Sequence, residues 1–184
     1  LLGIGTIWRL GQGGRGYGPW IVLGLCFGLG VLTKGPVIFL HLLPALLTLR
    51  LWGAAPPTLR EALRGFALAL GIGLVLVATW LVPLIAGAEP SFLREVLWAQ
   101  SADRVAGGLG HSRPVWYLAT VLPALIFPFG WSLSVWRGIL AAVRIDGAGR
   151  MLAIWSLTAF ALFSLVGGKQ LHYLLPELPA FAIL

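Results

Sequence analysis

Positively charged and imidazole side chains recur in three separate segments of this chain. The segments contribute Lys34; Arg104, His111 and Arg113; and Lys169 and His172. Such a set is suited to hold an anion, because an Arg guanidinium binds two phosphate oxygens at once and a Lys ammonium adds a point charge. Helix N-termini after Pro36 and Lys169 would add N–H donors. The pattern predicts a binding site for a phosphate, with a lipid-linked phosphate as the natural candidate.

The composition indicates that these segments connect membrane-spanning helices. Of the 184 residues, 59% are hydrophobic and 10% are charged, whereas soluble domains carry about a quarter charged residues. The 25 Gly and 12 Pro residues are tolerated where neighbouring helices satisfy the backbone. The net charge of +7 is explained by membrane topology, so we predict no nucleic-acid partner. Cys26 is the single cysteine, which excludes a disulfide or a cysteine-based metal site within this chain.

We expect an all-α polytopic membrane protein with several short spans. The expected spans lie near residues 1–8, 19–32, 37–49, 65–86, 114–136, 151–166 and 171–184, with an outer loop at 88–113. A hairpin turn at Lys34, kinks at Pro123 and Pro128, and a basic loop over 137–150 connect or bend them. The chain starts without Met and stops inside an apolar run, so we interpret both ends as cuts through helices.

The basic residues divide unequally if the spans alternate in direction. One side carries Arg9, Arg15, Arg50, Arg60, Arg64, Arg137, Arg144 and Arg150 with Glu61 and Asp146; the other carries Lys34, Arg94, Arg104, Arg113 and Lys169 with Glu89, Glu95 and Asp103. The positive-inside rule makes the arginine-rich side cytoplasmic. The predicted phosphate site therefore lies on the outer side, where topology alone does not explain the cations.

Several of these residues have simpler interpretations. Lys34 can extend from its hairpin to the lipid headgroups, and Arg113 can anchor a span at the same level. Arg94 lies in an amphipathic helical turn at the interface. His41, alone in a span, is favoured as a hydrogen-bonded packing residue. Glu177, a carboxylate in an apolar segment, is either functional or a local helix cap.

Three strings resemble motifs of one enzyme family, in the same order. Residues 30–36 (GVLTKGP) resemble its LTKGP turn, residues 111–118 (HSRPVWYL) its H-x-x-P-F-W-Y-Y span start, and residues 168–176 (GKQLHYLLP) its K-R-x-Y-Y-L-L-P turn. Residues 98–101 (WAQS) with Arg104 resemble the loop helix before the second motif. The likeness extends over residues 24–179 and is to bacterial membrane glycosyltransferases of the aminoarabinose transferase and protein mannosyltransferase superfamily.

The resemblance implies a GT-C fold, here a fragment of its transmembrane helix bundle in the bacterial inner membrane, with the active site on the periplasmic face. Such enzymes transfer a sugar from a polyprenyl-phosphate donor to a lipid, glycan or protein acceptor. The family's catalytic carboxylate lies in a long first outer loop, so we expect the base N-terminal to Leu1 and leave it unassigned. Asp103 and Glu89 are the local alternatives.

The resemblance also assigns donor-binding residues. Lys34, Arg104 and Lys169 are expected to bind the donor phosphate, where negative charge grows as the sugar leaves. The further donor-binding residues that we assign are His111, Arg113, His172 and Tyr173. No cofactor is assigned; a divalent metal at His111 and His172 is conceivable but poorly supported by two histidines. The third motif departs from the family where Leu171, His172 and Tyr173 replace a stretch with two aromatic residues, which leaves the sugar open.

Two other classes of protein fit part of the pattern. A secondary transporter or lipid flippase also has spans interrupted by Gly and Pro, although its polar residues usually lie near the bilayer midplane in repeated halves. A noncatalytic membrane subunit would use the outer cations to bind anionic lipid. Loss of sugar transfer on replacing Lys34, Arg104 and Lys169 separates these classes.

Overall fold

Every regular element in the described part of the computed structural model, residues 1–95 and 113–183, is a helix. The predicted all-α class is therefore confirmed. The chain divides into an N-terminal unit, Leu1–Ala88, and a C-terminal unit, Glu89–Leu184. Each unit is described by itself.

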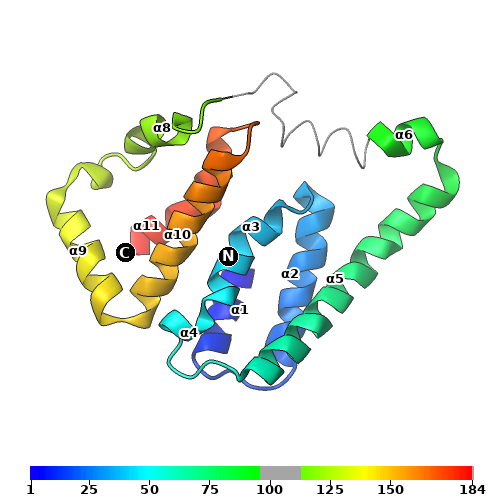
Figure 1. The fold of residues 1–184 in the computed structure, drawn as a ribbon, viewed down its shortest axis with the longest axis horizontal. Helices are drawn as coiled ribbons and strands as arrows, with labels where there is room; N and C mark the ends of the chain where they lie inside the picture. Colours follow the sequence, from blue (N-terminus) through cyan, green and yellow to red (C-terminus); the bar gives the residue numbers. More distant parts are fainter. Residues whose placement is uncertain (96–112, 184) are drawn as a thin grey trace. The chain divides into compact units, whose positions relative to one another are not determined.

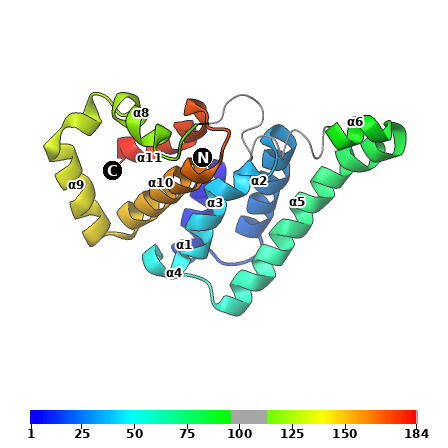
Figure 2. The same cartoon turned by 45° about the horizontal axis from the view of Figure 1, so that its top comes forward.

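The N-terminal unit contains five helices joined by short connections. They are α1 (Leu2–Gly11), α2 (Gly18–Lys34), α3 (Val37–Leu47), α4 (Leu49–Trp52) and α5 (Leu59–Gly87). In two views α5 runs alongside α2 over much of its length (Figures 1 and 2). The turn between α2 and α3 is tight, as predicted: Gly35 has φ +74°, and Lys34 is the last residue of α2. A positive φ at this position favours glycine, because a Cβ would strain the backbone there.

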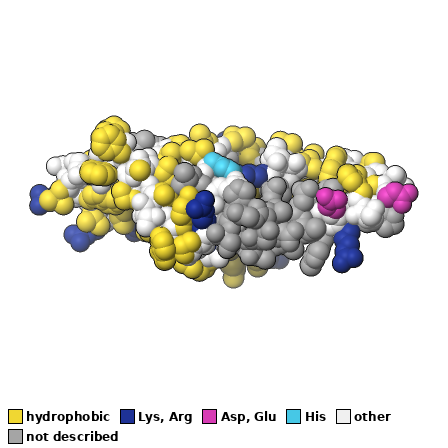
Figure 3. Space-filling view, turned by 90° about the horizontal axis from the view of Figure 1, so that it is seen from above, with side chains coloured by type: hydrophobic (Ala, Val, Ile, Leu, Met, Phe, Trp, Pro, Cys, Tyr) yellow, Lys and Arg dark blue, Asp and Glu magenta, His cyan; other side chains and the backbone are white. Residues whose placement is uncertain are grey.

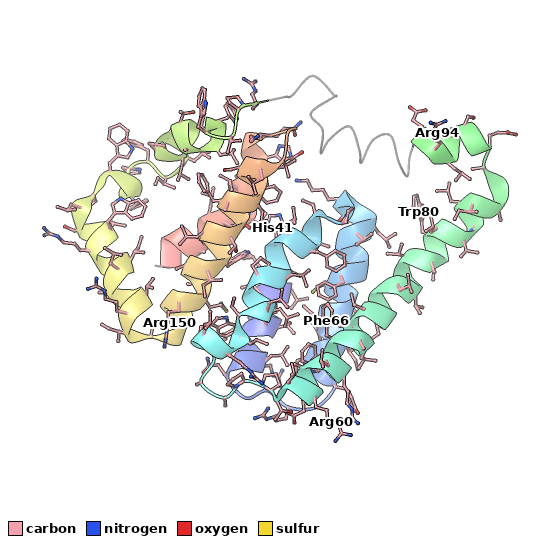
Figure 4. The ribbon with its side chains drawn as sticks, in the orientation of Figure 1. His41, Arg60, Phe66, Trp80, Arg94 and Arg150 are labelled. Carbon is pink, nitrogen blue, oxygen red and sulfur yellow. The ribbon has the colours of Figure 1, made fainter. Side chains whose placement is uncertain are left out.

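Small residues allow α2 and α5 to pack closely. A Cβ added to Gly24 would lie 2.7 Å from the carbonyl oxygen of Ala69, and one added to Gly28 would lie 3.0 Å from that of Gly73. Such close backbone approach is typical of helix pairs in membranes. The Phe66 ring on α5 (Figure 4) meets Phe27 of α2 edge-on, with ring centroids 6.2 Å apart.

Five arginines gather at one end of this unit, which we call the arginine end: Arg9, Arg15, Arg50, Arg60 and Arg64. Contacts between the elements that carry them establish the grouping. The Trp8 and Trp52 rings stack with centroids 5.8 Å apart, and the Ala55 N–H donates to the Gly11 carbonyl at 2.9 Å. Lys34 lies at the other end of α2, about 24 Å away for a helix of this length.

Thr58 stabilises the start of α5 by a reciprocal cap. Its Oγ1 accepts a hydrogen bond from the Glu61 N–H at 3.3 Å, while a Glu61 carboxylate oxygen accepts from the Thr58 N–H and Oγ1, both at 2.8 Å. This capping box satisfies N–H groups that lack partners within the helix. It explains why the helix begins at Leu59, directly after the Pro56-Pro57 linker.

We predict that Thr58→Ala lowers the free energy of unfolding by about 1 kcal/mol, the usual effect of removing a helix cap. The measurement is chemical denaturation of the purified protein in detergent, followed by circular dichroism. Thr33→Ala is the matched control, since the exposed Thr33 hydroxyl only donates back to the Gly30 carbonyl and its loss should stay within about 0.5 kcal/mol. Equal losses in the two variants would contradict the role of the cap.

The C-terminal unit contains the remaining described helices. They are α6 (Pro90–Arg94), α8 (Tyr117–Leu125), the 3₁₀ helix η2 (Phe129–Trp131), α9 (Leu133–Ile145), α10 (Gly147–Leu165), the 3₁₀ helix η3 (Leu171–Glu177) and α11 (Leu178–Ile183). Asp146 alone separates α9 from α10, and its carboxylate accepts a hydrogen bond from the Gly149 N–H at 2.6 Å. The two helices thus form a hairpin (Figure 1).

Three stretches of this unit differ from the sequence-based expectation. The apolar stretch 114–136 is not one kinked helix, since α8 ends at Leu125 and α9 starts at Leu133. Pro128 explains the break, because proline lacks an N–H and disfavours helical backbone at the residue before it. The basic loop expected over 137–150 is wrong: helix continues to Ile145 and resumes at Gly147. The stretch 171–184 begins with 3₁₀ rather than α-helix, up to Glu177.

Among the described residues, two helices are long and apolar enough to cross a membrane, α5 and α10; α2 and α3 are apolar but shorter. The most apolar window of α5 is only 11% buried, which suits a helix that faces lipid or another part of a membrane protein. The 19 residues of α10 extend about 28 Å, close to the thickness of the hydrocarbon layer. These features agree with the membrane class expected from the composition.

Candidate functional site

The candidate site of the C-terminal unit is centred on Lys169, in the turn that follows α10. Its side chain is 3% exposed, and its Nζ donates a hydrogen bond to the backbone carbonyl of Arg113 at 2.8 Å. The Arg113 N–H in turn donates to the Gly167 carbonyl at 3.3 Å. Two of the three predicted motifs, 56 positions apart along the chain, are therefore joined at one place.

Local backbone chemistry explains why the two segments meet. The backbone of Val166, which ends α10, is extended, and the N–H of Lys169 folds back to the Gly167 carbonyl at 3.0 Å. Pro114 disfavours helical backbone at Arg113, which leaves the polar groups of Arg113 available to the turn. The result is a short, hydrogen-bonded contact that holds the Lys169 side chain.

Arg113 and the residues after Lys169 surround this contact with further polar side chains. The exposed guanidinium of Arg113 lies 4.8 Å from the centroid of the Tyr117 ring, a cation–π distance. The exposed His172 ring lies edge-on to Tyr173 at 4.9 Å, and Tyr173 packs against Phe163 of α10 at 5.3 Å. Figure 3, which looks down on the upper edge of Figure 1, shows a histidine and cationic side chains at the surface.

Burial gives Lys169 its chemical potential. An ammonium removed from water is costly unless hydrogen bonds or an opposite charge compensate it. The Arg113 carbonyl occupies one of the three N–H donors of an ammonium. A phosphate oxygen would accept a second donor and supply the opposite charge. The arrangement is thus suited to an anion, with Arg113 close by as a second cation.

The structure separates the other predicted site residues. Lys34 is exposed and belongs to the N-terminal unit, so its convergence with Lys169 stays a prediction. Arg104 and His111, and with them the alternative base Asp103, lie outside the described residues. Lys169, His172, Tyr173 and Arg113 lie in one unit, and their roles also stay predictions.

The remaining polar candidates have the following positions. His41 is buried on α3 (Figure 4), in agreement with a packing residue, and Arg94 is exposed at the end of the short helix α6. Glu89 precedes α6 and is exposed, whereas Glu177, the last residue of η3, is 1% exposed. Within residues 1–95 and 113–183 no three His, Cys, Asp or Glu side chains gather as metal ligands. A metal that uses His111 stays a hypothesis.

Sequence reasoning missed two elements of this site. It did not identify the Arg113 carbonyl as the acceptor for Lys169, because backbone acceptors leave no trace in residue types. It also did not identify Tyr117 as the ring beneath the Arg113 guanidinium. The Arg-Pro pair followed by aromatic residues was the available signal for both.

The chain is similar to three groups of curated bacterial enzymes of one name. It is 30% identical over 172 residues to undecaprenyl phosphate-alpha-4-amino-4-deoxy-L-arabinose arabinosyl transferase 2 of Pseudomonas fluorescens, which covers 93% of this chain and 31% of that protein. It is 32% identical over 177 residues to the arabinosyl transferase of Pseudomonas paraeruginosa and 30% identical over 174 residues to that of Erwinia tasmaniensis, each covering 90% of this chain and 30% of that protein.

These similarities confirm the family resemblance that the three motifs predicted. They extend over nearly all of the chain, whereas the chain spans about a third of the length of these relatives. No protein-family model matches the chain, and no solved structure matches it.

Proposed function

We propose that this chain is part of a membrane glycosyltransferase that uses a polyprenyl-phosphate-linked sugar as donor, and that Lys169 binds the donor phosphate. The observation that carries the proposal is the buried Lys169 ammonium, held against the Arg113 carbonyl at 2.8 Å. The similarity to enzymes named as undecaprenyl phosphate-aminoarabinose transferases supports the same class of donor. The acceptor is a hydroxyl group of a lipid, glycan or protein.

The chemistry follows from where charge develops. As the bond between sugar C1 and the phosphate oxygen breaks, the sugar gains positive charge and the leaving polyprenyl phosphate gains negative charge. Fixed cations at the phosphate stabilise that transition state more than the ground state. Lys169 and Arg113 supply this charge from the C-terminal unit, with His172 and Tyr173 as hydrogen-bond donors. A carboxylate within reach of the acceptor hydroxyl removes its proton.

Lys34 and Arg104 complete the proposed phosphate site, at the outer, periplasmic face of a multi-pass protein of the inner membrane. Two separations support one polar face. Lys34 lies at the opposite end of α2 from the arginine end, and Lys169 follows the end of α10 that is remote from Arg150 (Figure 4). Since Lys and Arg favour cytoplasmic loops, the ends rich in arginine face the cytoplasm.

Replacing Lys34 or Arg104 by alanine in the full-length protein is expected to lower kcat for sugar transfer about 100-fold each, the usual cost of losing one charge-stabilising group. The assay follows a labelled sugar from a polyprenyl-phosphate donor in detergent. Arg50→Ala, an exposed cation at the arginine end, is the matched control and should retain activity. Full activity of both Lys34→Ala and Arg104→Ala would refute their place in the site.

The same variants separate the transporter hypothesis. A secondary transporter or flippase would move substrate across vesicles without forming any glycosidic product. Substrate flux that responds to the variants, with no transferase activity in the unmodified protein, would replace the enzyme proposal with transport.

A further inference from the structure

A second cluster of charged and aromatic side chains lies at the arginine end of the N-terminal unit. There, a cavity of about 270 Å³ opens between the loop after α1 and the start of α5. Its lining includes Arg15, Tyr17, Trp20, Glu61 and Arg64. None of these residues belongs to the proposed sugar-transfer site, so the cluster needs an explanation of its own.

Packing of glycines against an indole shapes this cavity. Trp20 is 5% exposed and lies so close to Gly65 that any side chain at position 65 would collide with the ring. Gly16 has φ +81°, which lets the loop turn away from α5. The hollow is thus built by the backbone and a buried ring, and charged side chains stand at its rim.

The charge of the cavity favours an anion. The negative charge of Glu61 is locally engaged, because its carboxylate accepts two hydrogen bonds from Thr58 at 2.8 Å and lies 3.6 Å from an Arg15 nitrogen. Arg15 and Arg64 are exposed, and each guanidinium has five N–H donors that match phosphate oxygens. The balance of one acid against two arginines leaves a net positive rim.

Apolar surface continues from the cavity along both helices. On α2, Ile21 and Leu25 follow Trp20 and are 43% and 40% exposed; on α5, Val75 shares a helix face with Arg64 and is 65% exposed. Tyr17, 67% exposed, stands at the rim, where tyrosine is typical of the boundary between headgroups and hydrocarbon. A free phosphate would use the arginines alone, whereas a phospholipid would use both the arginines and this apolar flank.

We propose that this cavity binds the phosphate headgroup of an anionic phospholipid, with Arg15 and Arg64 on the phosphate and the acyl chains along the flank of α2 and α5. The site is distinct from the proposed donor site, since it lies at the opposite end of the N-terminal unit from Lys34. Lipid binding here does not depend on sugar transfer.

Native mass spectrometry of the full-length protein, titrated with dioleoylphosphatidylglycerol, tests this proposal. Arg15→Gln and Arg64→Gln are each expected to weaken binding about fivefold, and the double variant about 25-fold, as for cations near anionic headgroups. Arg60→Gln is the matched control: Arg60 is exposed on the same helix (Figure 4) but does not line the cavity, so its effect should stay within about twofold. Arg64→Lys keeps the charge and should lose less than Arg64→Gln.

Three results would overturn the proposal. Equal weakening by Arg60→Gln and Arg64→Gln would indicate diffuse attraction by the whole arginine end. Equal binding of dioleoylphosphatidylcholine would remove the requirement for an anionic headgroup. Displacement of the lipid by inorganic phosphate at equal concentration would indicate a free-anion site. An unchanged melting temperature of the single variants shows that their effects are on binding.

Discussion

Replacing Lys169 by methionine is expected to lower kcat for sugar transfer by about 10²–10³-fold, the range found when one preorganised charge-stabilising donor is removed. Methionine keeps the length and apolar stem of the side chain but removes its charge and donors. Because the lost interaction strengthens as charge grows on the leaving phosphate, kcat should fall much more than KM rises. Steady-state kinetics of the full-length protein with a polyprenyl-phosphate sugar donor make the measurement.

The hydrogen bond from Lys169 to the Arg113 carbonyl requires a control for structure. Arg113→Ala keeps that carbonyl, and thus the bond, while it removes the guanidinium, so it reports on phosphate binding alone. Arg150→Gln, an exposed arginine at the other end of α10, should leave activity unchanged. A Lys169→Met protein that melts at the normal temperature and transfers sugar at the normal rate would refute the phosphate role of Lys169.

The helix class and the hairpin at Lys34 could be predicted from the sequence, because apolar periods and Gly-Pro turns act locally. The positions of the arginines within the N-terminal unit follow from the same reasoning: short connections force neighbouring helices to run in opposite directions. In the C-terminal unit this reasoning failed at Arg137. Its charge suggested a loop, but α9 carries it as an exposed residue of a helix that starts at Leu133. Charge alone does not end a helix, whereas Pro128 does.

The candidate site was predicted in part. The motifs around Arg113 and Lys169 indicated residues for one site, and the structure joins the two segments by hydrogen bonds. The burial of Lys169 could not be predicted, since a lysine in a glycine-rich turn usually extends to solvent. Burial here depends on a contact between residues 56 positions apart, which local sequence does not encode.

Glycines required a similar correction. The sequence indicated only that membrane helices tolerate glycine, whereas several glycines of α2 and α5 have a specific packing role. At Gly65 an added Cβ would lie 2.1 Å from the Trp20 indole, and at Gly71, on the same helix, it would meet nothing within 4 Å. The two positions therefore form a matched pair, with the same residue type in one helix and opposite surroundings.

Gly65→Ala is expected to destabilise the protein by about 1–3 kcal/mol, because the buried Trp20 ring must move to admit the methyl group. Gly71→Ala should instead be neutral or stabilise by up to about 1 kcal/mol, since alanine favours helix over glycine. Chemical denaturation in detergent measures both. Combining Gly65→Ala with Trp20→Leu should recover part of the loss, because the smaller side chain makes room for the new methyl group. Additive losses in that double variant, or equal effects at positions 65 and 71, would mean that the contact between Trp20 and Gly65 does not hold α2 against α5.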